Sequence, residues 1–289
     1  MTTSNPHAAM ILCAGLGTRL RPLTELVAKP MVPVGDAPAV AHVFARVAHL
    51  LPVVVNVHHH PEGLERWAEA SGVKVSREPE LLGTAGGLAA AGDLLGDGDV
   101  VVWNGDVLSN LDVRDLTEAH DRGGALATLA VRPRTDDRGN VGLDDQGRVV
   151  RLRGERFGAE ASSADFLGIH VVGAELRATL PRTGCLVGDV YIPALARGAR
   201  LGARLSRPSF RDIGSLAEYL AANRAWLADR GLEAWAGEGA SIDASIEGSV
   251  VGARARVDAP TIRSVVWPGA HVREPVEDAI VTLRGVVRP

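Results

Sequence analysis

The stretch AMILCAGLGTRLRPLTELVAKP, residues Ala9–Pro30, places a short apolar segment directly before a glycine turn. The apolar part is predicted to be a buried strand, because it is rich in aliphatic residues and ends at a glycine. Glycines after a strand let backbone N–H groups face a phosphate, and arginines add fixed cationic donors. A tight turn with solvated arginines is the alternative. The turn from Gly15 to Arg19, followed by Lys29, favours a triphosphate-binding site.

Two common phosphate-binding motifs do not fit this turn. A dinucleotide-binding fingerprint needs a third glycine, and Leu20 stands at that place after Gly15 and Gly17. A Walker A loop needs Gly-Lys-Ser/Thr after four intervening residues, which the stretch lacks. A nicotinamide-dependent dehydrogenase is therefore disfavoured.

Strand-like and helix-like segments alternate through the first two thirds of the chain. The buried strands are expected at Ala9–Gly15, Pro52–His58, Val101–Val107 and Ala125–Val131, with the helix-like stretches AVAHVFARVAHL and EGLERWAEA between them. This alternation predicts an α/β fold, a three-layer Rossmann-like and mostly parallel sheet with helices on both faces. Ligands bind such sheets beyond the carboxyl ends of the strands, where the glycine turn and Asp106 both fall.

Beyond residue 131 the expected elements are a hairpin, a long helix and a repetitive tail. Residues 132–157 are expected to form a hairpin whose turn is DDQG. Ser215–Gly231 is predicted to be a helix, capped by Ser215 with Glu218 completing a capping box. VVGARARV and VVWPGAHV then repeat an aliphatic-small-polar cycle, as hexapeptide β-helix coils do. We therefore expect a main domain over residues 1–236 and a short left-handed β-helix-like tail over 237–289, with self-association through that tail.

Composition limits the classes of partner. Of the 289 residues, 46% are hydrophobic and 23% charged, which is usual for a globular protein. The formal net charge of −4 gives no support for nucleic acid or an anionic membrane as the main partner. The chain has no apolar run of transmembrane length, and its start, MTTSNPHAAM, lacks the features of a secretory signal. Its two cysteines, Cys13 and Cys185, form no metal-binding spacing. We expect a cytoplasmic protein.

Several motifs in order resemble one known family. GLGTRLRPLTELVAKP, residues Gly15–Pro30, resembles the signature of the sugar-1-phosphate nucleotidyltransferases, also called NDP-sugar pyrophosphorylases. Further matches follow in the family's order: EPELLGTAGGL (Glu78–Leu88), NGDV (Asn104–Val107), GNVGLDDQGRV (Gly139–Val149), FLGIHVV (Phe166–Val172) and FRDIGSLAEYL (Phe210–Leu220). The resemblance covers roughly residues 8–230 and implies the reaction of an NTP with a sugar 1-phosphate to give an NDP-sugar and pyrophosphate.

The resemblance also implies roles for individual residues. The triphosphate would be cradled by Ala14, Gly15, Gly17, Thr18 and Arg19. The residues implied near the base and ribose are Glu80, Gly83 and Thr84, and those implied near the sugar phosphate are Gly142, Arg156 and Asp165. Arg19, Lys29 and Asp106 are the implied catalytic residues, and Asp106 and Asp212 the implied ligands of a Mg²⁺ cofactor. Without a ligand, Asp106 is a turn aspartate and Asp212 helps to start the following helix.

One motif departs from the family's pattern. Many members carry Glu-Lys-Pro just after the hairpin, and their lysine contacts the sugar phosphate, whereas this chain has RLRGERFGAE there, so Arg156 is the expected substitute. ELLGTAGGLAAA and KPMVPV are most similar to the mannose-1-phosphate guanylyltransferase branch. GTP and mannose 1-phosphate are thus the expected substrates. Uridylyl or thymidylyl transfer to a glucose or N-acetylmuramic acid 1-phosphate remains the alternative, and a non-catalytic subunit that senses nucleotide sugars is the rival class.

Overall fold

A computed structural model describes residues 7–289 and divides the chain into two compact units. The first unit holds the residues up to Gly15 together with Val43–Phe210, and the second holds Leu16–His42 together with Arg211–Pro289. Each unit takes in two separate chain segments, and the domain boundary expected after residue 236 stays a prediction. The change of unit between Gly15 and Leu16 falls inside the glycine turn. The prediction that the start of the chain lacks the features of a secretory signal concerns residues 1–10. Of these, residues 1–6 lie outside the described residues.

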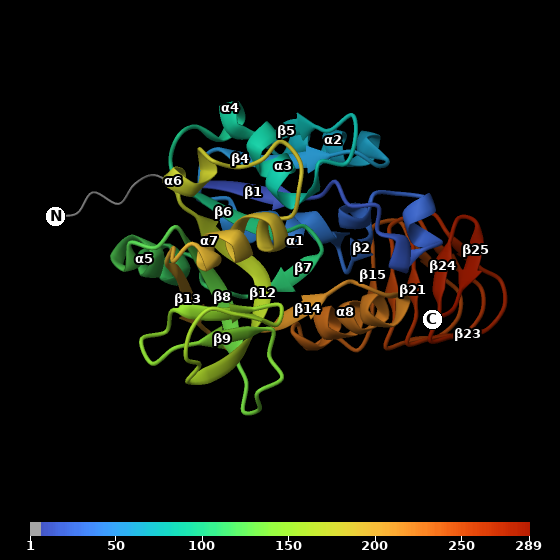
Figure 1. The fold of residues 1–289 in the computed structure, drawn as a ribbon. Coiled ribbons are helices and arrows are strands. Elements are labelled where there is room, and N and C mark those ends of the chain that lie inside the picture. The colour runs from blue at the N-terminus through green and yellow to red at the C-terminus, as the bar shows by residue number, and fades with distance from the viewer. Residues whose placement is uncertain (1–6) are drawn as a thin grey trace. The chain divides into compact units, whose positions relative to one another are not determined.

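The first unit is built on one large sheet (Figure 1). Its strands run in the order β11-β10-β9-β12-β6-β1-β4-β5, and β8 pairs with both β12 and β13. The strands β5, β4, β1 and β6 are parallel to one another, whereas β12 is antiparallel to β6. The bounds are β1 (Ala8–Leu12), β4 (Val53–Val57), β5 (Lys74–Arg77), β6 (Val100–Asn104), β8 (Ala127–Pro133), β9 (Val141–Leu143), β10 (Val149–Leu152), β11 (Glu155–Arg156), β12 (Ser162–Val172) and β13 (Leu201–Leu205). The α/β fold with a mostly parallel central sheet is therefore confirmed.

Helices cover both faces of this sheet. The helices are α1 (Ala39–Val47, which crosses into the first unit at Val43), α2 (Pro61–Ala70), α3 (Gly83–Ala90), α4 (Gly92–Leu95), α5 (Val113–Gly123), α6 (Ala174–Arg177), a π-helical turn (Leu186–Tyr191) and α7 (Ile192–Ala196). Leu88 and Tyr191 pack with Met10 of β1 in one buried cluster. Ile11 is equally buried but points to the other face, because neighbouring strand residues alternate. The apolar runs of the sequence therefore form a core on each side of the sheet.

The expected hairpin and its turn are present in the first unit. The strands β9 and β10 are antiparallel, and the turn between them is Asp144–Gly147. The Asp144 carboxylate accepts hydrogen bonds from the backbone N–H groups of Gln146 and Arg148, at 2.9 and 2.8 Å. An aspartate at the start of the turn thus supplies the acceptor that closes it.

The second unit combines the rest of the glycine turn with a helix and the tail. Its first segment contains three 3-10 turns and a small hairpin: η1 (Thr18–Leu20), η2 (Leu23–Glu25), η3 (Lys29–Met31), β2 (Pro33–Val34) and β3 (Ala37–Pro38). Its second segment starts at the end of β14 (Phe210–Asp212) and continues into α8 (Leu216–Ala228). The Ser215 hydroxyl accepts a hydrogen bond from the Glu218 N–H at 3.3 Å, which confirms the predicted cap.

The tail forms three sheets from short strands, which pair in parallel except for the last strand, β25, which is antiparallel to β24. The sheet orders are β15-β18-β21-β24-β25, β16-β19-β22 and β17-β20-β23. The bounds are β15 (Trp235–Ala236), β16 (Ser241–Ile242), β17 (Ile246–Glu247), β18 (Val250–Val251), β19 (Arg256–Val257), β20 (Thr261–Ile262), β21 (Val265–Val266), β22 (His271–Val272), β23 (Val276–Glu277), β24 (Ile280–Thr282) and β25 (Gly285–Val287). The β-helix-like segment is therefore confirmed.

The expected hexapeptide repeat of the tail was wrong. Val250 pairs with Val265, and Val265 with Ile280, so each coil takes 15 residues. Three hexapeptides would make a coil of about 18 residues. The two quoted repeats start at Val250 and Val265, so the shorter period was present in the sequence.

Buried serines link neighbouring coils of the tail. The Ser264 hydroxyl donates to the Ile262 carbonyl at 2.7 Å and accepts a hydrogen bond from the Ala279 N–H at 3.1 Å. Ser249, one coil earlier, accepts in the same way from the Ser264 N–H at 3.0 Å. Because these donors are buried, the serines satisfy backbone groups that water does not reach.

We expect Ser264→Ala to lower the free energy of unfolding by about 1–3 kcal/mol, because it leaves the buried N–H of Ala279 without its acceptor. Urea denaturation followed by circular dichroism measures this change. Ser241→Ala is the matched control, since Ser241 lies in the same segment but is exposed. Equal unfolding midpoints for the two variants would contradict the role given to Ser264.

Helix α8 holds the first segment of the second unit to the tail. The Tyr219 hydroxyl donates to the Pro33 carbonyl at 2.6 Å and accepts from the Trp267 indole at 3.0 Å. The Asn223 side chain accepts from the Gly35 N–H at 2.9 Å. These bonds fix the backbone that follows the glycine turn.

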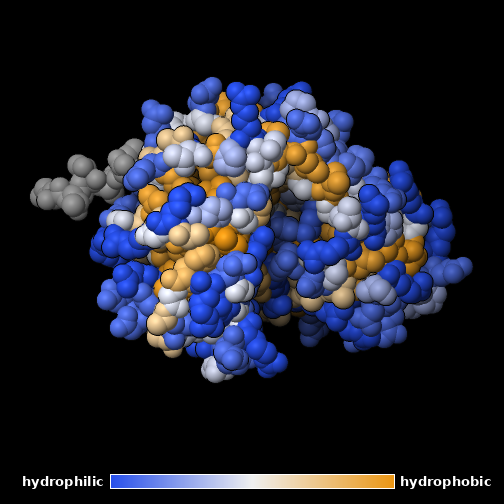
Figure 2. Space-filling view, in the orientation of Figure 1, coloured by the Kyte–Doolittle hydropathy of each residue, from blue (hydrophilic) through white to orange (hydrophobic). Residues whose placement is uncertain are grey.

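Within residues 7–289, no helix combines the length and the apolar character needed to cross a membrane. Figure 2 shows hydrophilic residues over most of one face, with smaller hydrophobic groups between them. The exposed large hydrophobic residues are Leu16, Leu51, Leu81, Leu205, Leu232, Leu283 and Val286.

Candidate active site

The first unit brings two predicted site segments to one edge of its sheet. Cys13–Gly15 follow the end of β1, and Asp106 lies in the turn between β6 and β7 (Val107–Ser109). Leu12 pairs with Asn104 in register, and the Gly105 N–H donates to the Leu12 carbonyl at 2.9 Å. The carboxyl ends of these parallel strands therefore meet as predicted.

A buried polar network organises the same edge. The Cys13 N–H donates to the Asn56 side chain at 2.6 Å, and the Asn56 amide donates to the Glu78 carboxylate at 2.6 Å. The second carboxylate oxygen of Glu78 accepts from the Leu82 N–H at 3.1 Å. Glu78 is only 4% exposed, so these bonds replace its contacts with water. The network joins the ends of β1 and β4 to the start of α3.

The family resemblance points to the neighbouring Glu80 and does not indicate this network. Glu80 is exposed in the loop before α3, whereas Glu78 is buried. A Cβ at Gly87 would lie 2.5 Å from the Glu78 carboxylate, so the glycine leaves room for it. The available signal was Asn56, a polar residue inside the otherwise aliphatic strand VVVNV. A nucleotide contact by Glu80 stays a prediction.

Gly83 and Thr84 have packing partners within the first unit. Gly83 has a φ of +75°, and a Cβ there would lie 2.4 Å from the Gly184 carbonyl oxygen. The Thr84 hydroxyl accepts from the Leu186 N–H at 2.8 Å. The glycine-rich start of α3 therefore packs closely against residues 184–186. Contact of these two residues with the base and ribose stays a prediction.

Cys13 is a core residue of this edge. Burial, and in second place the charge of Asp106, raise the pKa of the Cys13 thiol well above its usual value. The thiol therefore stays protonated and is no nucleophile at neutral pH. The effect also shows that Asp106 lies close enough to Cys13 for its charge to act there.

Two of the predicted sugar-phosphate residues, Gly142 and Arg156, meet at Glu160. A Cβ at Gly142 would lie 2.5 Å from the Glu160 carboxyl carbon. Arg151 binds Glu160 through two hydrogen bonds of 2.8 and 2.7 Å, and these bonds hold the pKa of Glu160 below its usual range. Arg156 lies 3.4 Å from the same carboxylate, with 62% of its side chain exposed. Arg156 is thus tethered at one end and accessible to an anion.

Asp165, the third predicted sugar-phosphate residue, is paired with an arginine. Its carboxylate accepts from Arg134 at 2.9 Å, and Arg134 also binds Asp136 at 2.6 Å. Because two carboxylates share this one guanidinium, Asp165 is a weak candidate for direct contact with a phosphate. Asp165 orients Arg134, and only through that arginine would it act on the sugar phosphate.

The second unit contains the rest of the glycine turn. Gly17 has a φ of +61°, and a Cβ there would lie 2.8 Å from the Thr24 methyl and 3.0 Å from the Lys29 Cβ. The Thr24 hydroxyl donates to the Gly17 carbonyl at 3.0 Å. Glycine is therefore required both by the backbone conformation and by the close approach of Lys29. Thr18 and Arg19 follow with exposed side chains.

Three predicted residues come together in the second unit. The Lys29 ammonium lies 3.9 Å from an Asp212 carboxylate oxygen, with the two side chains 12% and 41% exposed. A Cβ at Gly214 would lie 3.2 Å from both terminal nitrogens of Arg19, which places this guanidinium just before α8. Lys29 thus lies beside the Asp212 carboxylate, and Arg19 lies beside Gly214 with the Glu218 carboxylate close by, although Asp212 and Gly214 are far away in the sequence. This grouping suits a polyanionic ligand.

The predicted magnesium ligands have suitable chemistry. Asp106 and Asp212 both offer carboxylate oxygens, the hard donors that Mg²⁺ prefers. Asp106 belongs to the first unit and Asp212 to the second, so a shared ion stays a prediction. Lys29 already supplies a positive charge next to Asp212.

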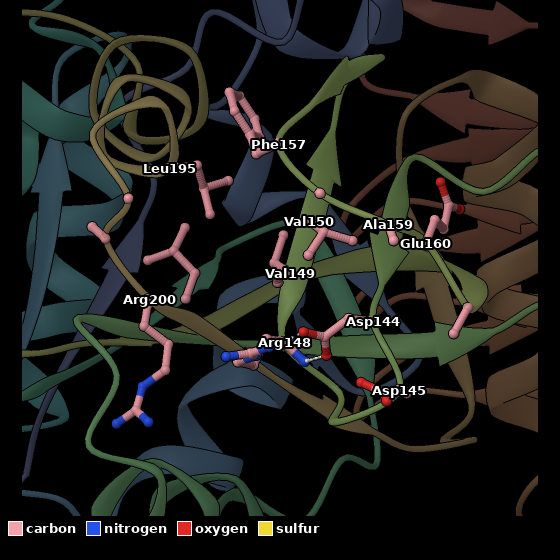
Figure 3. A pocket seen from close by; sticks show the side chains of 15 residues that line it. Asp144, Asp145, Arg148, Val149, Val150, Phe157, Ala159, Glu160, Leu195 and Arg200 are labelled. Carbon is pink, nitrogen blue, oxygen red and sulfur yellow. Dashed lines mark hydrogen bonds and ion pairs between the residues drawn. The ribbon is translucent and has the colours of Figure 1, made fainter.

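A cavity of about 580 Å³ lies elsewhere in the first unit (Figure 3). It is lined by Asp144, Asp145, Arg148, Val149, Val150, Phe157, Gly158, Ala159, Glu160, Ala161, Leu195, Gly198, Ala199, Arg200 and Leu201. None of these is a predicted site residue. Leu201, which lines the cavity, pairs with Ala127 at the start of β8. The cavity is therefore a separate feature from the strand ends that carry Asp106.

Comparison with known proteins identifies similar chains. The family model described as Nucleotidyl transferase matches residues 8–228. A probable mannose-1-phosphate guanylyltransferase 1 of Oryza sativa subsp. japonica is 30% identical, over 76% of this chain and 64% of that protein. A UTP–glucose-1-phosphate uridylyltransferase of Synechocystis sp. is 28% identical, over 78% and 63%. This chain therefore covers less than two thirds of these relatives.

Solved structures share the fold. HddC from Yersinia pseudotuberculosis complexed with GMP-PN matches with a TM-score of 0.64 and 20% identity, over 76% of this chain and 99% of that one. A putative glucose-1-phosphate thymidylyltransferase from Bacillus anthracis matches with a TM-score of 0.63 and 21% identity, over 76% and 94%. At this level of identity the likeness concerns the fold alone.

Proposed function

This chain belongs to the nucleotidyl transferase family, and we propose that it transfers a nucleotidyl group from a nucleoside triphosphate to a sugar 1-phosphate. The phosphate oxygen of the sugar would attack the α-phosphorus, the bond from that phosphorus to the bridging oxygen would break, and pyrophosphate would leave. The observation that carries the proposal is the pairing of Lys29 with Asp212 beside the Gly17 turn, with the Arg19 guanidinium just before α8. Such a reaction brings anions together, so fixed cations are what it needs from the protein.

The chain's own residues would act by positioning and charge. The Gly17 turn and Arg19 would hold the triphosphate, and Lys29 would neutralise charge that develops around the α-phosphorus. The ammonium is poised for this because its stem packs on Gly17 and its side chain is only 12% exposed. No covalent nucleophile is required, in keeping with the buried, protonated Cys13.

We propose Asp106 and Asp212 as the residues that hold the Mg²⁺ cofactor. A bound Mg²⁺ would supply positive charge to the phosphate oxygens. Asp106 stands at the carboxyl end of β6, where its charge stays near the surface and out of the core. Asp212 stands at the end of β14, just before α8.

The preferred substrates are GTP and mannose 1-phosphate. The rice relative is named for this pair, and a mannose-1-phosphate guanylyltransferase catalytic subunit beta of Danio rerio is 32% identical over 73% of this chain. The Synechocystis relative supports the alternative, uridylyl transfer to glucose 1-phosphate. The exposed guanidinium of Arg156, tethered to Glu160, is the proposed substitute for the family's lysine at the sugar phosphate.

Pyrophosphate release tests both the reaction and the substrates. The purified chain is assayed with each nucleoside triphosphate against mannose, glucose and N-acetylmuramic acid 1-phosphates, in the presence of Mg²⁺. We expect the highest kcat/KM for GTP with mannose 1-phosphate, and a higher value for UTP with glucose 1-phosphate would replace that pair. Tight binding of a nucleotide sugar without turnover of any pair would instead support the non-catalytic sensing subunit.

Two broader expectations remain proposals. We propose a cytoplasmic location and self-association through the β-helix-like tail. Leu283 and Val286, at the end of the tail, are 73% and 46% exposed, which supports a contact surface there. Light scattering of the whole chain at several concentrations would show whether it associates.

A further inference from the structure

We propose that His7, Asp99, His120 and Asp121 form a second metal site, which binds one divalent ion of the Zn²⁺ class. His7 directly precedes β1 and Asp99 directly precedes β6, so both stand at the amino ends of parallel strands. His120 and Asp121 lie in the last turns of α5. Asp106 lies at the carboxyl ends of the same strands, so this site is separate from the candidate active site.

The distances between the possible ligand atoms suit one small ion. The His7 Nε2 lies 3.2 Å from an Asp121 oxygen and 3.9 Å from the Asp99 Oδ2. The His120 Nε2 lies 3.5 Å from that same Asp99 oxygen. Four tetrahedral ligands at about 2.0–2.1 Å from Zn²⁺ are about 3.4 Å from one another. The ligand atoms of His7, Asp99 and Asp121 all lie within 4.8 Å of one another, so these three are close to a coordinating arrangement, and His120 adjoins them through Asp99.

The His7 ring is buried and aimed into this group. Only 6% of its side chain is exposed, and its Nε2 makes no hydrogen bond to any described residue. A buried polar nitrogen of this kind is costly unless a partner binds it. A metal ion between His7, Asp99 and Asp121 would satisfy it.

The local charge also favours a cation. Asp99 and Asp121 both lie within 3.9 Å of His7, and the two carboxylates repel each other. The neighbouring Arg177 lies close enough for the charge of Asp99 to act on it, but it donates its hydrogen bonds to the carbonyls of Gly96 and Gly98. A divalent ion would neutralise both carboxylates at once.

The outer contacts orient two of the ligands. The His120 Nδ1 lies 2.9 Å from the Thr128 hydroxyl, which leaves its Nε2 directed at Asp99. The Asp99 Oδ1 accepts from the Ala174 N–H at 2.8 Å, which leaves its Oδ2 for the ion. Such second contacts fix the ligand atoms in metal sites. Asp121, with 30% of its side chain exposed, leaves a way in for the ion.

The donor set points to zinc chemistry. Two imidazole nitrogens with two carboxylate oxygens suit Zn²⁺ and related transition-metal ions, whereas Mg²⁺ prefers oxygen ligands and keeps several waters. The ion would join the residue before β1 to the start of β6 and the end of α5. Its role would therefore be to stabilise the amino edge of the sheet.

Calorimetry with ZnCl₂ on the whole chain, stripped beforehand with a chelator, tests the site at neutral pH. We expect the unchanged chain to bind one equivalent of Zn²⁺, and Asp121→Asn to bind it at least about tenfold more weakly. Asp97→Asn is the matched control, because it removes the same charge from an exposed residue two positions from Asp99. This control is expected to bind as tightly as the unchanged chain. Titration with Co²⁺ gives a second readout, the visible absorption of a tetrahedral complex.

Several results would overturn the site. One is that the unchanged chain binds no stoichiometric Zn²⁺, which would make His7 a protonated partner of the two carboxylates. Another is equal binding by Asp121→Asn and Asp97→Asn, which would assign the ion to other histidines such as the run His58–His60. Circular dichroism confirms that both variants are folded before binding is compared. Because the assay measures metal binding alone, its outcome is independent of the proposed nucleotidyl transfer.

Discussion

The Asp106→Asn variant is expected to lose at least about 100-fold in kcat while it remains folded. Asparagine keeps the shape of the side chain but removes the negative charge that would hold Mg²⁺ against the phosphates. Asp106 is half-buried in the turn between β6 and β7, outside the strands, and asparagine is well suited to a turn position. The loss should therefore fall on turnover rather than on stability.

Pyrophosphate release at saturating substrate, repeated over a range of Mg²⁺ concentrations, measures the effect. Asp145→Asn is the matched control, since Asp145 is an exposed turn aspartate of the same unit. The control should keep its full rate and its thermal midpoint. Near-normal turnover by Asp106→Asn would remove Asp106 from the proposed metal ligands.

The Lys29→Gln variant is expected to lose about 100-fold in kcat/KM. Its ammonium is the group proposed to neutralise charge near the α-phosphorus, and the neutral amide cannot replace it. Lys29→Arg should restore only part of the rate, because a planar guanidinium does not place its charge where a compact ammonium does. The close packing of the Lys29 stem on Gly17 strengthens this expectation.

The chain offers a natural control for this change. It contains only two lysines, Lys29 and Lys74. Lys74 is exposed on β5, and its ammonium donates to the Leu94 carbonyl at 3.2 Å. Lys74→Gln should leave kcat/KM unchanged under the same assay. A similar and small loss in both variants would show that Lys29 has no special role.

Local chemistry explains how much of the fold could be predicted. The aliphatic runs around Val55 and Val102 became parallel strands, because their pattern requires burial on both faces. Ser215 caps α8 as expected, since a cap depends only on residues a few positions apart. The length of the tail's coil was missed because its repeat had to be recognised across 15 residues, from Val250 to Val265.

By itself the sequence determined the family, the central sheet and the glycine turn after β1, because each depends on the order of residues within short segments. Only the tertiary structure decided which side chains meet. It placed Lys29 beside Asp212, joined the buried Glu78 to Asn56, and gathered His7 with Asp99 and Asp121. These contacts join segments far apart in the chain, and they form only when the strands and helices pack, so no local pattern could specify them.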